Sequence, residues 1–291
     1  MNDPNQDPAQ FIAILEGAGE RHTTAIDGTG KAGPGAAGDV VWHSWGRGEP
    51  LVLLHGGTGS WLHWVRNVEP LARDFTVLVP DLPGSGESAS PPPPISAESI
   101  ARSISSGIAA IIGEQAPFCI AGFSMGGLIA GYVASQCAPR ARVLVLVGSS
   151  GMEGPRSPMA PLVSWRRLAT EEEKLATHRK NLSILMIHDP NRIDALAVHA
   201  QARNAVASRV RGKHVSNTGA LSRCLPGFAG RIAGIWGEYD PTAAPHFDER
   251  RARLNQFRRD ASFELVPGVG HWVQYEAHEW FNKRMLELLT T

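Results

Sequence analysis

A serine in the segment Gly122-Phe123-Ser124-Met125-Gly126 is the residue of this 291-residue chain best placed to act as a nucleophile. The apolar run 117–121 before it predicts a strand, and the run 127–136 after it predicts a helix. A serine on such a sharp turn is held in a strained backbone conformation, and the flanking glycines let the neighbouring chain approach closely. The turn would present the Ser124 hydroxyl at the carboxyl edge of a parallel sheet, before the free N–H groups of a helix. This context predicts nucleophilic attack on a carbonyl carbon.

A serine hydroxyl reacts at neutral pH when a base lies within hydrogen-bond reach and a third group orients that base. Among the 11 histidines, His271 directly follows the last predicted strand, and Asp240 follows the strand before it. Both should therefore lie at the same sheet edge as Ser124. The competing interpretations are a loop histidine satisfied by backbone groups and an aspartate that caps a helix. Glu238 stays open as an alternative acid, and Glu153 is a less favoured one.

The negative oxygen of an acyl-transfer transition state needs fixed hydrogen-bond donors. The backbone N–H of Met125, directly after the serine, is one predicted donor. The second should come from the loop after the strand 51–54, where His55-Gly56-Gly57 lets the backbone approach a substrate. We predict the N–H of Gly57 as this second donor and a structural role for His55.

The predicted strands are apolar on both faces and alternate with helices, which indicates a parallel sheet covered on both sides. Strands are predicted at 40–45, 51–54, 76–79, 117–121, 142–147, 232–236 and 262–266, and helices at 61–73, 96–114, 127–136 and 272–289. Between 155 and 226 the patterns predict helices alone, with a capping box at Thr170-Glu171-Glu172-Glu173, so this insertion should lie over the strand ends like a lid. The predicted division is a flexible lead-in at 1–38, a core at 39–151 and 227–291, and a helical cap at 152–226.

The composition excludes several classes of function. Lys plus Arg and Asp plus Glu number 28 each, so the formal net charge of zero argues against nucleic acid or an anionic membrane as a partner. No apolar run approaches the ~18 residues of a membrane span, and the first residues lack the pattern of a signal peptide. The 3 widely spaced cysteines favour a reducing compartment. We therefore expect a cytoplasmic protein that uses no metal or cofactor and acts on a small-molecule substrate, with homo-oligomerisation left open.

Together these residues resemble the α/β-hydrolase family, from about Val40 to the end of the chain. The resemblance rests on His55-Gly56-Gly57, Asp81-Leu82-Pro83-Gly84-Ser85-Gly86, the segment around Ser124, Asp240 and Gly270-His271. The chain order serine, aspartate, histidine is that of the family's catalytic triad. The resemblance implies an α/β fold with a mostly parallel eight-stranded sheet, helices on both faces and a helical cap inserted after the sixth strand.

The segment Gly270-His271-Trp272-Val273-Gln274-Tyr275-Glu276 also resembles the meta-cleavage-product hydrolases, which split a carbon–carbon bond beside a ketone. That resemblance implies that Arg203 binds a substrate carboxylate. Two positions depart from the pattern, because Phe123 and His63 stand where those enzymes usually carry asparagines that polarise the dienoate substrate. Phenylalanine cannot form a hydrogen bond, so the departure favours ester hydrolysis.

We predict a serine hydrolase that cleaves a small, largely apolar ester through an acyl-enzyme. Ser124 is the predicted nucleophile, His271 the base and Asp240 the acid that orients the base. Carbon–carbon bond hydrolysis of a meta-cleavage product is the alternative, and a non-catalytic ligand-binding protein on the same fold is a hypothesis of another class. The predicted pocket residues are Arg203, His63, Phe123, Trp165, Met186 and Trp272.

Overall fold

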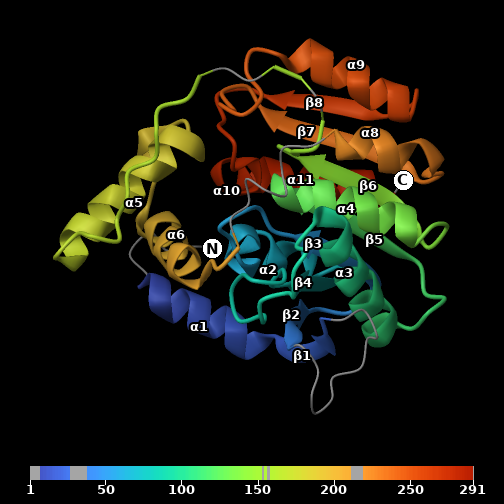
Figure 1. Ribbon diagram of the computed structural model, residues 1–291, viewed down its shortest axis with the longest axis horizontal. Helices are drawn as coiled ribbons and strands as arrows, with labels where there is room; N and C mark the ends of the chain where they lie inside the picture. Colours follow the sequence, from blue (N-terminus) through green and yellow to red (C-terminus); the bar gives the residue numbers. More distant parts are fainter. Residues whose placement is uncertain (1–6, 27–37, 153, 156–157, 211–218, 291) are drawn as a thin grey trace.

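Eight strands of the described residues form one twisted sheet. The computed structural model describes residues 7–26, 38–152, 154–155, 158–210 and 219–290, and its strand order is β1-β2-β4-β3-β5-β6-β7-β8. Strand β2 pairs antiparallel with both β1 and β4, and all other neighbours pair parallel. The strands are β1 Glu20–Ala25, β2 Asp39–Trp45, β3 Glu49–Leu54, β4 Phe75–Pro80, β5 Phe118–Phe123, β6 Ala141–Val147, β7 Arg231–Gly237 and β8 Ser262–Val266. This arrangement, visible in Figure 1, confirms the predicted fold class.

The parallel strands end in register at one edge of the sheet. Phe123 at the end of β5 pairs with Val147 of β6, and Val147 pairs with Ile235 of β7. Gly237 of β7 then pairs with Val266, the last residue of β8. The loops that leave these strands therefore meet at the carboxyl edge, where open parallel sheets bind ligands.

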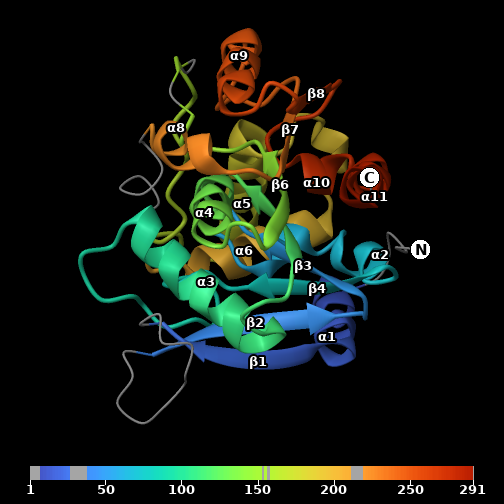
Figure 2. The ribbon, with the colours of Figure 1, turned by 90° about the vertical axis from the view of Figure 1, so that its right-hand side faces the viewer.

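Helices cover both faces of the sheet. They are α1 Pro8–Ala18, η1 Trp61–Trp64, α2 Val68–Leu71, α3 Ala97–Ile112, α4 Met125–Gln136, α5 Glu171–Leu185, η2 Pro190–Arg192, α6 Ala195–Ala207, α8 Ala220–Cys224, η3 Leu225–Gly227, α9 Phe247–Phe257, α10 Val273–Glu276 and α11 His278–Thr290. On β5, Cys119, Ala121 and Phe123 join a core that includes residues of α1, α2, α6 and α11, while Phe118 and Ile120 join a core with α3, α4, α8 and α9. Figure 2 shows α3 and α4 on one side of the sheet and α2 and α11 on the other.

Between β6 and β7 the described residues form helices and no strand. The predicted capping box begins α5, because the Thr170 hydroxyl accepts the Glu173 N–H at 3.2 Å and the Glu173 carboxylate accepts the Thr170 N–H at 3.0 Å. Asp194 caps α6 through the N–H of Ala197 at 2.8 Å. In Figure 1, α5 and α6 pack together beside the sheet, and α1 lies along α6.

The N-terminal segment corrects a prediction. Residues 8–25 of the expected flexible lead-in form the helix α1 and the edge strand β1, whereas 27–37 lie outside the described residues. Asp7 and Pro8 start α1, and the Trp45 indole N–H anchors its end by donating to the Leu15 carbonyl at 2.8 Å. Strand β1 is polar and half exposed because it lies at the sheet edge, so it lacks the apolar pattern of the inner strands.

Two helices predicted as continuous are broken. The 61–73 segment forms η1 and α2, since Pro70 lacks the N–H that a helix running through from η1 would need. Asn67 fills the break, and its amide donates to the Gln274 carbonyl and the Asn282 amide oxygen, each at 2.8 Å. The 272–289 segment divides at Ala277 into α10 and α11.

Candidate active site

The turn at Ser124 has the strained geometry that its sequence predicts. Its φ of 52° and ψ of −116° lie in a region that side-chain-bearing residues avoid. The Ser124 N–H donates to the Val147 carbonyl at 2.8 Å, which holds the turn on the neighbouring strand β6. A Cβ at Gly122 would collide with the Gly126 carbonyl, and one at Gly126 would collide with the Leu54 carbonyl. Both glycines are therefore needed for the chain to turn this sharply from β5 into α4.

His271 and Asp240 form a buried hydrogen-bonded pair. Their side chains are 3% and 0% exposed, and His271 Nδ1 donates to Asp240 Oδ2 at 2.8 Å. The other carboxylate oxygen, Oδ1, accepts the backbone N–H and the hydroxyl of Thr242, each at 2.8 Å. With its proton on Nδ1, the imidazole has Nε2 free to act as a hydrogen-bond acceptor.

The pair lies against Phe123, which directly precedes Ser124, and against Gly148, which directly follows β6. The Phe123 ring lies 4.8 Å from the His271 ring, centroid to centroid. Gly148 has a φ of 51°, and a Cβ there would lie 2.9 Å from His271 Nδ1 and 3.2 Å from Asp240 Oδ2. Sequence reasoning missed Gly148, although a glycine directly after an apolar strand is a signal for a close backbone approach.

Glu238, the alternative acid, has a different partner. Its carboxylate accepts the Gly268 N–H at 2.9 Å on the surface, while Asp240 holds the imidazole. The other alternative, Glu153, lies outside the described residues.

The predicted oxyanion donors lie beside the serine turn. Met125 is the first residue of α4, where a helix leaves its N–H groups without intrahelical partners. A Cβ at Gly57 would come within 4.0 Å of Met125 Sδ, and one at Gly56 within 3.2 Å of Ser124 Cβ. The loop after β3 (55–59, hereafter the oxyanion loop) thus passes directly over the serine turn. His55 is buried within it, and burial lowers the pKa of its imidazole to about 4, consistent with a structural role.

The predicted pocket residues include one aromatic cluster. The His63 ring lies 5.3 Å from the rings of Phe123 and Trp272, centroid to centroid. Met186 belongs to the same core, and its carbonyl accepts the Trp272 N–H at 2.7 Å. These four predicted residues are brought together, and Phe123 among them lies against the His271 ring.

A cavity of about 450 Å³ opens beside the oxyanion loop. Thr58 of that loop and the predicted pocket residue Trp165, which lies between β6 and α5, both line it. Arg166 and Arg209 also lie in its wall. Arg203 is not among the lining residues, because its guanidinium is half exposed and pairs with Glu16 of α1 at 3.2 Å. Its predicted role with a substrate carboxylate stays a prediction.

Glu276 is a further positioning residue that the sequence motif contained without revealing its role. Its buried carboxylate accepts three backbone N–H groups, those of Gly270 at 2.7 Å, His188 at 3.0 Å and Asp189 at 2.8 Å. It therefore ties the loop that carries His271 to the segment between α5 and η2. Such a network rigidifies a buried polar site when every member is satisfied.

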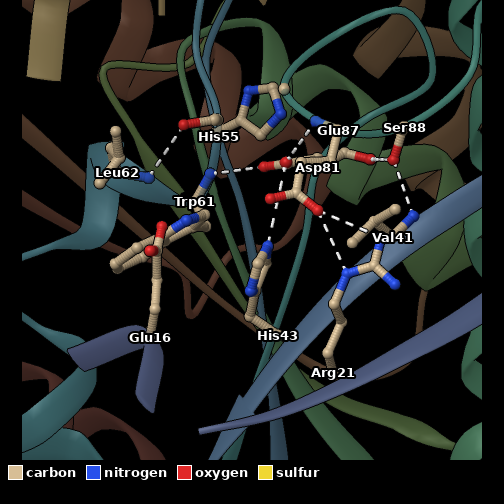
Figure 3. A network of polar contacts seen from close by, with 12 residues as sticks. Glu16, Arg21, Val41, His43, His55, Trp61, Leu62, Asp81, Glu87 and Ser88 are labelled. Carbon is tan, nitrogen blue, oxygen red and sulfur yellow. Dashed lines mark hydrogen bonds and ion pairs between the residues drawn. The ribbon is translucent and has the colours of Figure 1, made fainter. Parts of the chain in front are cut away.

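A second buried histidine and aspartate, His43 and Asp81, face each other in Figure 3. The Asp81 carboxylate accepts the backbone N–H of Trp61 at 2.8 Å and of Glu87 at 2.9 Å. His43 Nε2 lies 4.0 Å from Asp81 Oδ2, and no described residue forms a hydrogen bond with it. Burial raises the pKa of Asp81 to about 6 and lowers the pKa of His43 to about 4. Asp81 thereby fixes the start of η1 and the loop after β4.

The described residues contain neither a metal-binding cluster nor a membrane-spanning helix. No group of three or more His, Cys, Asp or Glu side chains there is arranged to hold a metal ion. No described helix has the length and apolar character needed to cross a membrane.

The comparisons with known proteins identify the family. The model of the "Alpha/beta hydrolase family" matches residues 51–284. The chain belongs to the alpha/beta hydrolase family. A pimeloyl-acyl-carrier-protein methyl ester esterase of Vibrio parahaemolyticus is 40% identical over 114 residues, which span 38% of this chain and 41% of that relative. A 2-hydroxy-6-oxononadienedioate/2-hydroxy-6-oxononatrienedioate hydrolase of Comamonas testosteroni is 26% identical over 259 residues, 84% of this chain and 88% of that one.

Solved structures agree with the fold. An esterase from Rhodococcus sp. ECU1013 superposes with a TM-score of 0.73 at 19% identity, covering 94% of this chain and 99% of that one. The chain is an enzyme of the hydrolase class, as its family and its named relatives establish.

The pKa of His43 predicts a pH dependence of stability. An unfolded histidine binds a proton near its ordinary pKa of 6.5, whereas folded His43 does so near pH 4. The unfolded state therefore gains protons first as the pH falls from 6.5 to 4, and stability is lost in that window. Between pH 7 and pH 4.5 we expect the free energy of unfolding of His43→Leu to fall by roughly 2–3 kcal/mol less than that of the wild-type protein. Urea unfolding of both proteins at the two pH values measures it, and an equal loss in the two proteins would contradict the prediction.

Gly148→Ala should disable the site, because the new methyl group would push the His271–Asp240 pair out of place. We expect kcat for a p-nitrophenyl ester to fall by about 100-fold, the usual effect of displacing a catalytic group by an ångström. Gly113→Ala is the matched control, since Gly113 also has a positive φ, of 91°, but nothing lies within 4 Å of its Cβ position. Gly113→Ala should lose stability from backbone strain and keep kcat. Equal kcat values for the two variants would contradict the role of Gly148.

Proposed function

We propose that this enzyme is a serine hydrolase that forms an acyl-enzyme on Ser124, with His271 as general base and Asp240 as the acid that orients it. The observation that carries the proposal is the buried 2.8 Å hydrogen bond between His271 Nδ1 and Asp240 Oδ2, beside the strained turn of Ser124. The sequence predicted Ser124 from the glycine-flanked turn between a strand and a helix, and Asp240 and His271 from their positions after the last two strands. The buried hydrogen bond adds a tautomer and an orientation, which the sequence did not contain.

The reaction begins when Ser124 Oγ attacks the ester carbonyl carbon and its proton passes to Nε2 of His271. Asp240 stabilises the imidazolium that forms, while Thr242 keeps the second carboxylate oxygen hydrogen-bonded. The N–H groups of Gly57 and Met125 receive the oxyanion. The imidazolium then protonates the departing alkoxide as the ester C–O bond breaks. A water molecule, deprotonated by His271, attacks the acyl-enzyme and releases the acid and the free serine hydroxyl.

An ester is the substrate class that we propose. The Vibrio relative is named as a methyl ester esterase, and its similarity to this chain supports the assignment. The 1% exposed Phe123, which offers no hydrogen bond beside the nucleophile, favours an apolar acyl group there. We propose a small-molecule substrate that enters through the cavity beside Thr58 and Trp165. The cytoplasmic location stays a prediction.

Carbon–carbon bond hydrolysis is the second candidate, because the similarity to the Comamonas hydrolase extends over most of both chains. The Phe123 side chain and the Arg203–Glu16 ion pair weigh against it. The first removes a polar contact beside the nucleophile, and the second occupies the guanidinium that would bind the substrate carboxylate.

Labelling with a fluorophosphonate tests the nucleophile. We expect the wild-type enzyme to label at Ser124 and Ser124→Ala to lose both labelling and at least about 10⁴-fold in kcat. Asp240→Asn should cost about 10⁴-fold, since the amide would favour the wrong imidazole tautomer. Glu238→Gln is the matched acid control and should keep kcat. A folded Ser124→Ala variant with full activity would contradict the mechanism, and a folded wild-type enzyme that does not label would favour a ligand-binding protein.

Turnover of two substrate classes separates the enzyme hypotheses. We expect kcat/KM for 2-hydroxy-6-oxo-6-phenylhexa-2,4-dienoate, the substrate named for a Burkholderia cepacia relative, to be lower by at least about 10³-fold than for p-nitrophenyl butyrate. The missing polar contact at Phe123 is the physical reason. A preference of similar size for the dienoate, together with a KM for it that rises in Arg203→Gln, would establish the alternative.

A further inference from the structure

We propose that His63 is a positioning residue that fixes the oxyanion loop by accepting the Gly56 N–H on a neutral imidazole. The inference rests on the proposed function, since it concerns how the Gly57 donor is aimed. It adds a residue to the machinery that none of the named catalytic groups includes.

The contact defines the protonation state of His63. The Gly56 N–H donates to His63 Nδ1 at 3.1 Å, so Nδ1 carries no proton and the ring proton lies on Nε2. The side chain is 2% exposed, and burial lowers its pKa well below the ordinary value, with further lowering by the neighbouring His55 and His271. Protonation would also place an Nδ1–H against the Gly56 N–H, donor against donor. His63 is therefore neutral wherever the fold is intact at ordinary pH.

The carbonyl of Gly56 is held as well. His55 Nε2 accepts the Leu82 N–H at 2.8 Å, which leaves the His55 proton on Nδ1, and this N–H donates to the Gly56 carbonyl at 2.8 Å. Both polar groups of Gly56 are thus bonded to neutral imidazoles with fixed tautomers, and the residue cannot rotate without losing a buried hydrogen bond.

Holding Gly56 aims the next N–H. The peptide between Gly56 and Gly57 is trans, so the Gly57 N–H points opposite to the Gly56 carbonyl. With that carbonyl directed at His55, the Gly57 N–H is directed away from His55. A donor aimed in advance is what stabilises a developing oxyanion, because it needs no reorganisation during the reaction.

His63 is itself held by the base-bearing loop. Its carbonyl accepts the Trp272 indole N–H at 2.8 Å, and Trp272 directly follows His271. Its ring lies between Phe123 and Trp272. A Cβ at Gly59 would collide with the ring, so the oxyanion loop is shaped around this histidine. The imidazole thereby connects the loop of the oxyanion donor to the loop of the base.

Three substitutions at His63 test the acceptor. Asparagine can place its Oδ1 where Nδ1 stands, whereas leucine has no acceptor and glutamine carries its amide one bond too far out. We expect His63→Asn to keep kcat for p-nitrophenyl butyrate within about fivefold, and His63→Leu and His63→Gln to lose about 30- to 300-fold with KM changed less than about threefold. An alkylboronic acid forms an adduct that mimics the oxyanion. Its inhibition constant should rise by the same factor by which kcat falls.

His43→Leu is the matched control, because it also replaces a buried, neutral histidine near η1 but touches neither Gly56 nor the serine turn. It should keep kcat, and thermal melting confirms that each variant is folded. Equal losses in His63→Asn and His63→Gln, or a His63→Gln variant with wild-type kcat, would overturn the inference. If His63→Leu does not fold, the Asn and Gln pair still decides. If Ser124→Ala is inactive and His63→Gln keeps full activity, the inference about His63 is refuted and the proposed function stands. If Ser124→Ala is active, the proposed function is refuted.

Discussion

The buried hydrogen bond between His271 and Asp240 is the interaction on which the site depends. A carboxylate with no exposed surface is costly to bury unless its oxygens are hydrogen-bonded. Here the imidazole satisfies one oxygen, and Thr242 satisfies the other with two donors. The fold must leave space for this pair. It does so with Gly148, directly after β6, where a Cβ would lie too close to the imidazole. The orientation of the His271 imidazole thus depends on packing at the sheet edge as well as on its hydrogen bond to Asp240.

The loops at this edge are held to one another by buried polar groups. Glu276 ties the loop of His271 to the segment between α5 and η2, and Asp81 fixes the start of η1. His63 then connects η1 to the oxyanion loop through its ring and to Trp272 through its carbonyl. Loops are normally the most mobile parts of a domain. In this protein each one that carries a proposed catalytic group is bonded to a neighbour, so the groups keep a common frame.

The parts of the fold that could be predicted are those where the local sequence pattern reflects the burial and backbone conformation of the segment. The inner strands are continuous apolar runs because both of their faces are covered, and the turn at Ser124 has glycines where the backbone needs them. Strand β1 escaped prediction, because an edge strand with one exposed face has a polar sequence. The single helix expected at 61–73 is broken around Asn67, whose amide N–H groups donate to residues more than two hundred positions away. The partners of that amide have no local signature.

The sequence alone determined the order of the inner strands along the chain and the glycine-flanked turn at the serine. It also placed an acid and a histidine after the last two strands. These features follow from local pattern and chain order. The tertiary structure decided which acid meets the histidine, since Asp240 faces the imidazole while Glu238 turns to Gly268. It also decided that Arg203 pairs with Glu16, and that His63 accepts the N–H of Gly56. Such pairings depend on where elements distant in the chain pack against each other, and a side chain's partner is chosen by that packing rather than by its neighbours in sequence.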